Sequence, residues 1–137
     1  MQMRMAIKVW MQAFRLRTLP LALSCIAMGA FLAASVNAFR LDVFLLCVLT
    51  TVSLQILSNL ANDYGDTIHG ADSAERVGPS RAVQRGVISS GQMKRALIIF
   101  VVLCLCSGVS LLIVSFGMNW NALLFFSDLV CLAFLPR

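Results

Sequence analysis

The chain has 137 residues, of which 60% are hydrophobic and only 12% charged, and its formal net charge is +5. This apolar share exceeds that of an ordinary soluble domain and excludes a water-soluble enzyme or binding module. The basic residues flank apolar runs, so they report membrane topology and we expect no nucleic-acid partner. The cysteines all fall within apolar runs and form no Cys-x-x-Cys pair, which disfavours a metal or disulfide role.

Four apolar runs are long enough to cross a membrane, which takes about twenty residues. They cover residues 19–39, 41–61, 96–116 and 119–135. The runs are continuous rather than alternating, which favours helices over strands. The fourth is the weakest, because an unpaired Asp128 would cost about 2.5 to 3.5 kcal/mol on insertion. The sequence therefore predicts an all-α, multi-pass transmembrane bundle that forms one membrane domain over residues 1–137.

The orientation of the bundle follows from its basic residues, which accumulate on the cytoplasmic side of a membrane. They lie before the first run and between the second and third, and only Arg40 falls in the opposite connection. This places the N-terminus and a polar loop at residues 65–95 in the cytoplasm. The first run also has features of a signal peptide cleaved after Ala38, but it is long for one and further runs follow it.

Two shorter patterns predict where helices lie at the ends of these runs. Before the first run, apolar side chains recur at helical spacing and predict an amphipathic helix in the headgroup layer; they are Ile7, Trp10, Met11 and Phe14. Before the third run, Ser89 and Gln92 have the spacing of a capping box, which predicts a helix that begins near Ser90.

A polar motif, NLANDYGDTIHGAD at residues 59–72, follows the second run directly. On a helix, its polar side chains and one from the preceding turn share an arc of about 100 degrees. We call this set the polar stripe: Gln55, Asn59, Asn62, Asp63 and Asp66. Taken alone, either asparagine is better explained as a bridge between helices. The whole group, with Asp72 and basic residues following, favours an ion or substrate site.

The chemistry of the motif indicates the kind of ligand. Carboxylate and amide oxygens without histidine or thiolate partners suit Mg²⁺, which takes one or two carboxylates and completes its shell with water and substrate phosphate. A bound divalent ion would also relieve the repulsion between neighbouring carboxylates. Basic side chains in the following loop suit the rest of a polyanion; they are Arg76, Arg81, Arg85, Lys94 and Arg95. A metal and a cationic loop at a membrane surface together suggest a lipid diphosphate.

Residues 54–99, LQILSNLANDYGDTIHGADSAERVGPSRAVQRGVISSGQMKRALII, resemble the first aspartate-rich motif and cytoplasmic loop of intramembrane prenyltransferases of the UbiA superfamily. The similarity runs from RLRTLPLA at Arg15 to about Gly108, and it is strongest to the menaquinone branch. It implies a helical bundle in the bacterial cytoplasmic membrane, in which Mg²⁺ binds a polyprenyl diphosphate. An electron-rich carbon of 1,4-dihydroxy-2-naphthoate then attacks the allylic cation, giving demethylmenaquinone.

The resemblance also implies roles for individual residues. Asp63 and Asp66 become the catalytic carboxylates. The implied metal ligands are Asn62, Asp63, Asp66 and Asp72, and the implied diphosphate contacts are Asn59, Asn62, Arg81, Gln84, Arg85 and Lys94. A third carboxylate often follows in the superfamily at N-x-x-x-D-x-x-x-D spacing; here Gly70 holds that place and Asp72 comes two residues later.

Members of the superfamily have about nine spans and a second aspartate-rich motif, whereas this chain reaches Arg137 after four expected spans. The leading interpretation is an N-terminal portion that carries half of an active site and has little activity alone. The alternative is an inactive fragment or small membrane protein that binds a lipid diphosphate or divalent metal without catalysis. A cation transporter is disfavoured, because Asp63 and Asp66 cluster at one end of one helix.

Overall fold

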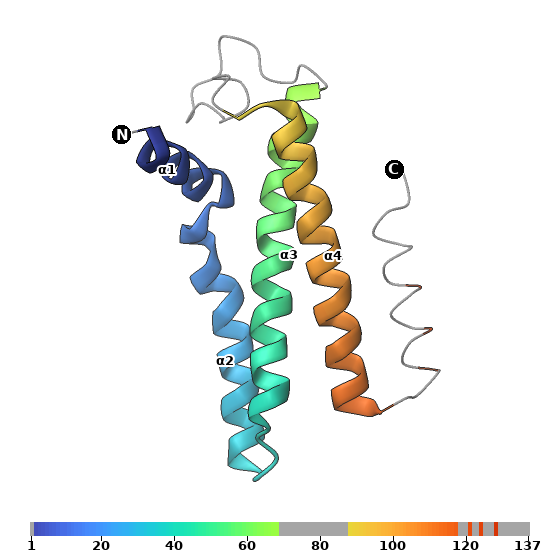
Figure 1. Cartoon of the computed structure of the whole chain (residues 1–137). Coiled ribbons are helices and arrows are strands. Elements are labelled where there is room, and N and C mark those ends of the chain that lie inside the picture. The colour runs from blue at the N-terminus through green and yellow to red at the C-terminus, as the bar shows by residue number, and fades with distance from the viewer. Residues whose placement is uncertain (1, 69–87, 118–120, 122–123, 125–127, 129–137) are drawn as a thin grey trace.

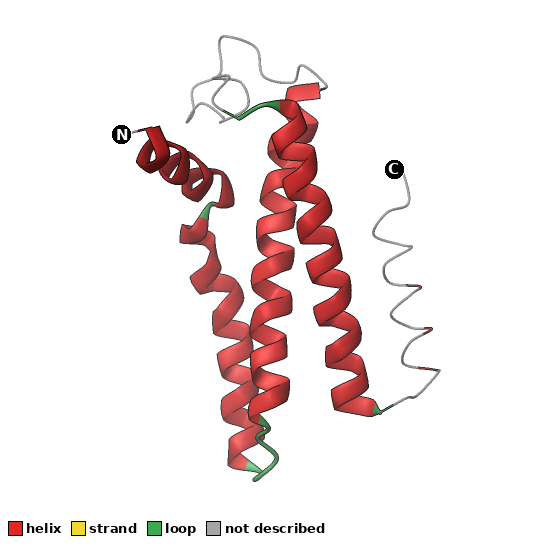
Figure 2. Ribbon diagram, viewed as in Figure 1, coloured by secondary structure: helices red, strands yellow, loops and turns green. Residues whose placement is uncertain are grey.

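The computed structural model describes residues 2–68 and 88–117, together with the single positions 121, 124 and 128. The elements in chain order are α1 (Gln2–Phe14), the 3₁₀ turn η1 (Leu16–Thr18), α2 (Leu19–Ser35), α3 (Leu41–Ile68) and α4 (Ser90–Phe116). Within these ranges there is no strand, and the all-α prediction is confirmed (Figure 2). α3 contacts α1, α2 and α4, and Figure 1 shows α1 beside the bundle, near the end at which α3 finishes.

Three segments are long and apolar enough to cross a membrane: Ile7–Ser35, Leu41–Asp66 and Ser90–Phe116. Their large apolar side chains face outward, as Leu21, Phe31 and Ile99 illustrate. Such a surface is unfavourable in water and favourable in lipid, which fits a membrane protein. The fourth expected span, 119–135, lies outside the described residues except for positions 121, 124 and 128.

The helices around the expected polar loop are longer than the apolar pattern alone suggested. α3 continues through Gly65 to Ile68, and α4 begins at Ser90. Both margins of the 65–95 segment are therefore helical, and its middle, residues 69–87, lies outside the described residues. As a result, the whole polar stripe lies on one continuous helix.

α2 ends at Ser35, four residues before the end of the apolar run, because Asn37 adopts a left-handed conformation with φ of 57°. The amide of Ala38 donates to the carbonyl of Ala33 over 2.8 Å, and the amide of Asn37 donates to that of Ala34 over 3.1 Å. This pair of bonds is a Schellman motif, in which asparagine tolerates the left-handed position better than most residues. The chain thus leaves the helix and turns into α3.

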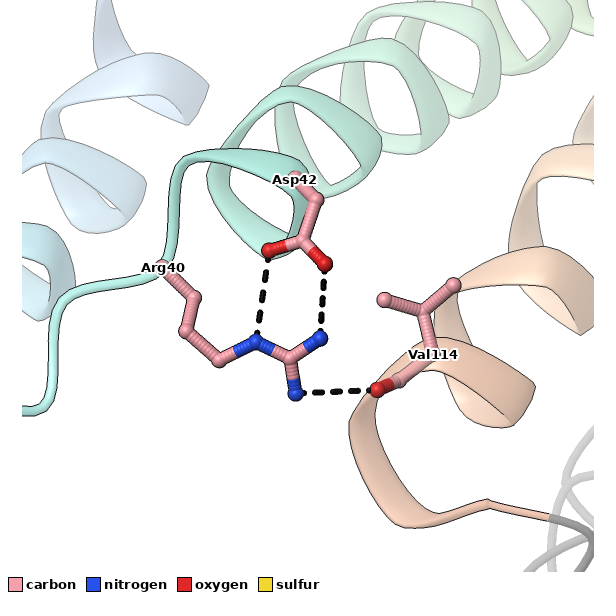
Figure 3. A network of polar contacts seen from close by, with 3 residues as sticks. All are labelled: Arg40, Asp42 and Val114. Atoms are coloured by element: carbon pink, nitrogen blue, oxygen red, sulfur yellow. Dashed lines mark hydrogen bonds and ion pairs between the residues drawn. The ribbon is translucent and has the colours of Figure 1, made fainter.

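Arg40, in the turn between α2 and α3, binds two elements at once (Figure 3). Its Nε and Nη2 atoms donate to the two carboxylate oxygens of Asp42 over 3.3 and 2.6 Å. Its Nη1 donates to the carbonyl of Val114 over 3.0 Å, which is one of the last carbonyls of α4 and has no partner within that helix. The Asp42 carboxylate raises the pKa of Arg40, chiefly through the hydrogen bond. We call this arrangement the Arg40 clamp.

The start of α4 confirms the predicted capping box. The Ser89 hydroxyl accepts from the Gln92 amide over 3.2 Å, while the Gln92 side chain accepts from the Ser89 amide over 2.9 Å. Two amides that would otherwise lack helical partners are satisfied in this way.

We expect Ser89→Ala to destabilise the chain by about 1 kcal/mol, because the cap bond to the Gln92 amide is lost. Ser90→Ala is the matched control, since Ser90 is exposed in the first turn and makes no cap. Thermal unfolding in detergent measures the difference. Equal melting temperatures for the two variants would contradict a stabilising cap.

The core lies at the end of the bundle where α1 rests on α3 and α4. Its buried members are Ala13, Ile56, Leu60, Ile88 and Met93. Phe14 packs edge-to-face on Phe100 of α4 with ring centroids 5.6 Å apart. The best-packed part of the described bundle therefore surrounds the C-terminal half of α3.

α1 is helical, as predicted, but its packed face is different from the predicted stripe. Val9, Trp10, Ala13 and Phe14 pack toward the core, whereas Ile7 and Met11 are exposed. The small Ala13 allows α1 to approach α3 closely, so the contact face is centred on it rather than on the bulkiest apolar side chains. The contact with the bundle therefore uses Trp10 and Phe14 of the predicted stripe and leaves Ile7 and Met11 at the surface.

Candidate functional site

The polar stripe lies along the margin of the buried face of α3. Ile56 and Leu60 form the centre of that face in the core. Asn59 and Asp63 lie beside them, with 6% and 3% of their surface exposed. Gln55 and Asp66 are half-buried, and Asn62, on the other edge of the stripe, is exposed. The five polar groups therefore do not share one environment, because only the edge of the stripe that faces α1 is covered.

Asp63 forms an ion pair with Arg15, which lies directly after α1. The distance from Arg15 Nη2 to Asp63 Oδ1 is 2.7 Å. The Asp63 side chain is 5% exposed and the Arg15 side chain 39%, so the pair joins a buried carboxylate to a cation that still reaches solvent. Breaking a pair of this kind from the arginine side leaves a buried charge to be compensated in another way.

Arg15 is held toward α3 by its backbone. It has φ of 50° and ψ of 49°, a left-handed conformation that costs a non-glycine residue free energy. Its amide donates to the carbonyl of Gln12 over 3.2 Å, and its own carbonyl accepts from the Thr18 amide over 2.9 Å. This conformation ends α1 and turns the chain through η1 into α2. We call residues 15–18 the elbow.

A second bond holds the end of α1 on α3. The Asn59 Nδ2 atom donates to the backbone carbonyl of Phe14 over 3.0 Å. That carbonyl belongs to the last turn of α1, where no helical amide remains to donate to it. Asn59 therefore acts as a bridge between helices in this structure, which is the simpler of the two interpretations open for it from the sequence.

Lys94, an expected diphosphate contact, lies close to the motif at the start of α4. Its Nζ atom is 5.9 Å from the centroid of the Tyr64 ring, a separation at the outer limit of a cation–π contact. Tyr64 directly follows Asp63 on α3. Lys94 is exposed, so it lies at the surface beside Tyr64, where a ligand can reach it.

The structure brings together only part of the expected site. Asn59, Asn62, Asp63, Asp66 and Lys94 all lie at one end of the bundle. Four other expected ligands, Asp72, Arg81, Gln84 and Arg85, fall outside the described residues. Within the described ranges, no three His, Cys, Asp or Glu side chains gather as a metal-binding group.

The residues present nevertheless suit a hard cation. Asp63 and Asp66 are three residues apart on α3, so their side chains lie within one helical turn of each other on neighbouring positions of the helix surface. Mg²⁺ commonly takes one or two carboxylates from a protein and fills its remaining positions with water and phosphate oxygens. The donor set therefore fits Mg²⁺, and the ion would have to bind beside the Arg15 guanidinium.

Arg15 is the site residue that sequence reasoning missed. In the sequence it is one of the basic residues before the first apolar run, which indicate topology, and 48 positions separate it from Asp63. A pair so distant in sequence leaves no local spacing pattern. The available signal was a buried acidic residue without a nearby basic one on its own helix, which calls for a cation from elsewhere.

Comparison with known proteins identifies the family to which the sequence is similar. The model of the UbiA prenyltransferase family matches residues 22–135. The match continues well past Gly108, so the earlier limit expected from the sequence is wrong. No solved structure matches the chain significantly.

Curated relatives carry one common name. A 1,4-dihydroxy-2-naphthoate octaprenyltransferase of Escherichia coli (strain K12) is 49% identical over 108 residues, which is 79% of this chain and 35% of the relative. One from Haemophilus influenzae is 43% identical over 129 residues, which is 93% of this chain and 42% of the relative. A third, from Mycobacterium tuberculosis, is 42% identical over 74 residues, 54% of this chain and 25% of the relative. The chain thus spans well under half the length of these proteins.

Proposed function

The chain belongs to the UbiA prenyltransferase family, and from this premise we infer that it forms the diphosphate-binding part of a membrane enzyme of menaquinone synthesis. The proposed reaction transfers a polyprenyl group from its diphosphate to 1,4-dihydroxy-2-naphthoate. The names of the relatives support the acceptor and the type of donor. The observation that carries the proposal is a buried carboxylate, Asp63, one turn from Asp66 at the end of an apolar bundle.

Within this proposal, Asp63 and Asp66 would hold Mg²⁺, with Asn62 and Asp72 as further ligands. When bound, the ion would supply positive charge that stabilises the diphosphate as a leaving group. Lys94 stands exposed beside Tyr64 and would contact the diphosphate oxygens as a point charge. Arg81, Gln84 and Arg85, in the part of the sequence that follows α3, would complete the diphosphate site.

Asn59 contributes to the site by positioning it. Its bond to the Phe14 carbonyl fixes the end of α1 beside Asp63, which covers one side of the carboxylate. A covered carboxylate interacts more strongly with a charged ligand than one in bulk water, because less solvent screens it. The burial of Asp63 therefore supports its assignment to the ligand site.

We further propose that the site faces the cytoplasm of a bacterial cell, in its cytoplasmic membrane. Arg4, Lys8, Arg15 and Arg17 precede α2, at the end of the bundle where α3 finishes and α4 begins, and only Arg40 lies in the opposite connection. This asymmetry follows the positive-inside rule. A site that opens to the cytoplasm can also be reached by a charged, water-soluble acceptor.

Binding and transfer can be tested separately on the full chain in lipid nanodiscs. We expect a polyprenyl diphosphate to bind in the presence of Mg²⁺ and to lose at least about tenfold in affinity in Asp66→Ala, because one charge-assisted ligand is removed. Asp42→Ala is the matched control: it removes an aspartate from the other end of the same helix. Unchanged binding by Asp66→Ala would count against the proposed site.

The same preparation, supplied with 1,4-dihydroxy-2-naphthoate, distinguishes the two functions that the sequence left open. Prenylated product that disappears in Asp66→Ala supports catalysis by the chain itself. Mg²⁺-dependent diphosphate binding without product supports a binding function and places catalysis in a longer protein. If the chain neither binds the diphosphate nor forms product, both functions are overturned.

A further inference from the structure

The Arg15–Asp63 ion pair places a protein cation on the carboxylate that the proposed site assigns to a metal. The guanidinium Nη2 lies 2.7 Å from Asp63 Oδ1, which is direct charge-assisted hydrogen bonding. Arg15 reaches this position from a different element, the elbow after α1, and keeps a left-handed backbone to do so. A buried carboxylate and a strained cationic residue in contact indicate a relationship beyond simple packing.

We propose that Arg15 is a positioning residue that serves as the built-in counter-ion of Asp63 and competes with the metal ion for it. This inference rests on the proposed function, since it concerns the same carboxylate. It gives a role at the site to Arg15, which lies where the family resemblance begins but was not among the expected site residues. It also couples metal affinity to the contact between the end of α1 and α3.

The competition follows from elementary electrostatics. A divalent cation on Asp63 would stand within a few ångströms of the Arg15 guanidinium, and like charges at that separation repel strongly where little water screens them. Arg15 is 39% exposed and can turn toward solvent when the ion arrives. In the absence of metal, the same guanidinium lies on the buried carboxylate and compensates its charge.

The exchange is coupled to the packing of α1, because Arg15 is the residue that ends that helix. Two contacts join the end of α1 to the polar stripe: the Arg15–Asp63 pair and the bond from Asn59 to the Phe14 carbonyl. Binding of an ion removes the first and leaves the second. Linkage then requires that the Arg15–Asp63 pair weakens metal binding by the same factor by which a bound ion weakens the pair.

The first measurement is the affinity of the full chain for Mn²⁺ alone, followed by electron paramagnetic resonance, with Mn²⁺ in place of Mg²⁺ and no diphosphate present. Arg15→Gln is expected to bind Mn²⁺ about tenfold more tightly than the unchanged chain, a coupling of ordinary size between two linked sites. Arg17→Gln is the matched control, because it removes the same charge from an exposed position two residues away on the elbow. It should change the affinity by less than about twofold, because exposed charges are well screened.

A second measurement follows α1 directly. Trp10 packs against the core, and replacing Trp120 with phenylalanine leaves Trp10 as the only tryptophan of the chain. Mg²⁺ is expected to shift Trp10 emission to longer wavelength, with a midpoint equal to that of metal binding. In Arg15→Gln the shift should be present before metal is added, and further Mg²⁺ should change it little.

The outcomes separate this inference from the proposed function. If Mn²⁺ binds and the binding is lost in Asp66→Ala, the proposed metal site is supported. If, in addition, the Mn²⁺ affinity of Arg15→Gln is equal to or lower than that of Arg17→Gln, only the competition between Arg15 and the metal is overturned. If the unchanged chain shows no binding that depends on Asp66, both fail. Should Arg15→Gln not fold, Arg15→Lys keeps the charge but loses the planar fork; its affinity should exceed that of the unchanged chain, and an unchanged or lower value would refute the inference.

Discussion

Asp63→Asn should abolish Mg²⁺-dependent diphosphate binding, with a loss of at least about a hundredfold, while leaving the bundle folded. Asparagine has nearly the shape of aspartate, so the packing around a side chain that is 5% exposed is preserved. The lost quantity is the negative charge, on which affinity for a hard divalent cation depends. The loss should exceed that in Asp66→Ala, because Asp66 is only half-buried and its interactions are better screened by water.

The measurement is a titration of the full chain with a polyprenyl diphosphate at fixed Mg²⁺, repeated without the ion. Asp42→Asn provides the control, since it neutralises an exposed aspartate at the opposite end of α3. Circular dichroism and thermal unfolding show whether each variant is folded. Asp63→Asn leaves Arg15 without its partner carboxylate, so a loss of about 1 to 3 kcal/mol of stability is expected. A folded variant with undiminished Mg²⁺-dependent binding would remove Asp63 from the site.

Leu60→Ala should destabilise the chain by about 2 kcal/mol or more. Leu60 is fully buried, with 0% of its surface exposed, at the point where α1, α3 and α4 meet. Truncation leaves a cavity whose lining loses dispersion contacts, and this part of the cost persists in a membrane, where transfer from water counts for less. Because Leu60 adjoins Asn59, the cavity should also loosen the docking of α1.

Leu54→Ala is the appropriate comparison, because Leu54 lies on the same helix and is 51% exposed. It should alter stability by less than about 0.5 kcal/mol. Unfolding by heat or by denaturing detergent, followed by circular dichroism, gives both values under identical conditions. Similar losses for the two variants would mean that the packing described around Leu60 does not stabilise the protein.

Much of the fold followed from patterns local in sequence. Long apolar runs predict helices, and the Ser89–Gln92 spacing located the start of α4, because both signals act within one or two helical turns. Hydropathy alone placed helix ends less well. α2 stops at Ser35 inside an apolar run, since the turn depends on the left-handed conformation of Asn37 rather than on polarity.

The candidate site was only partly predictable. Helical periodicity correctly places the polar residues of α3 near one another, but it cannot say which edge of the stripe is covered. That depends on Ala13 of α1, which lets the helix approach Asn59 and Asp63 and leaves Asn62 exposed. The partner of Asp63 could not be predicted from the sequence for the same reason, since Arg15 contacts Asp63 only when α1 is packed on α3.

The Arg40 clamp has a consequence for biogenesis. It joins residues that are 74 positions apart: a turn made early in synthesis and a carbonyl in the last turn of α4. The Schellman motif at the α2–α3 turn needs only local contacts, whereas the clamp forms only when α4 is complete and packed antiparallel to α3. The bond from Arg40 to Val114 is therefore present in the packed three-helix bundle and absent from the α2–α3 hairpin alone.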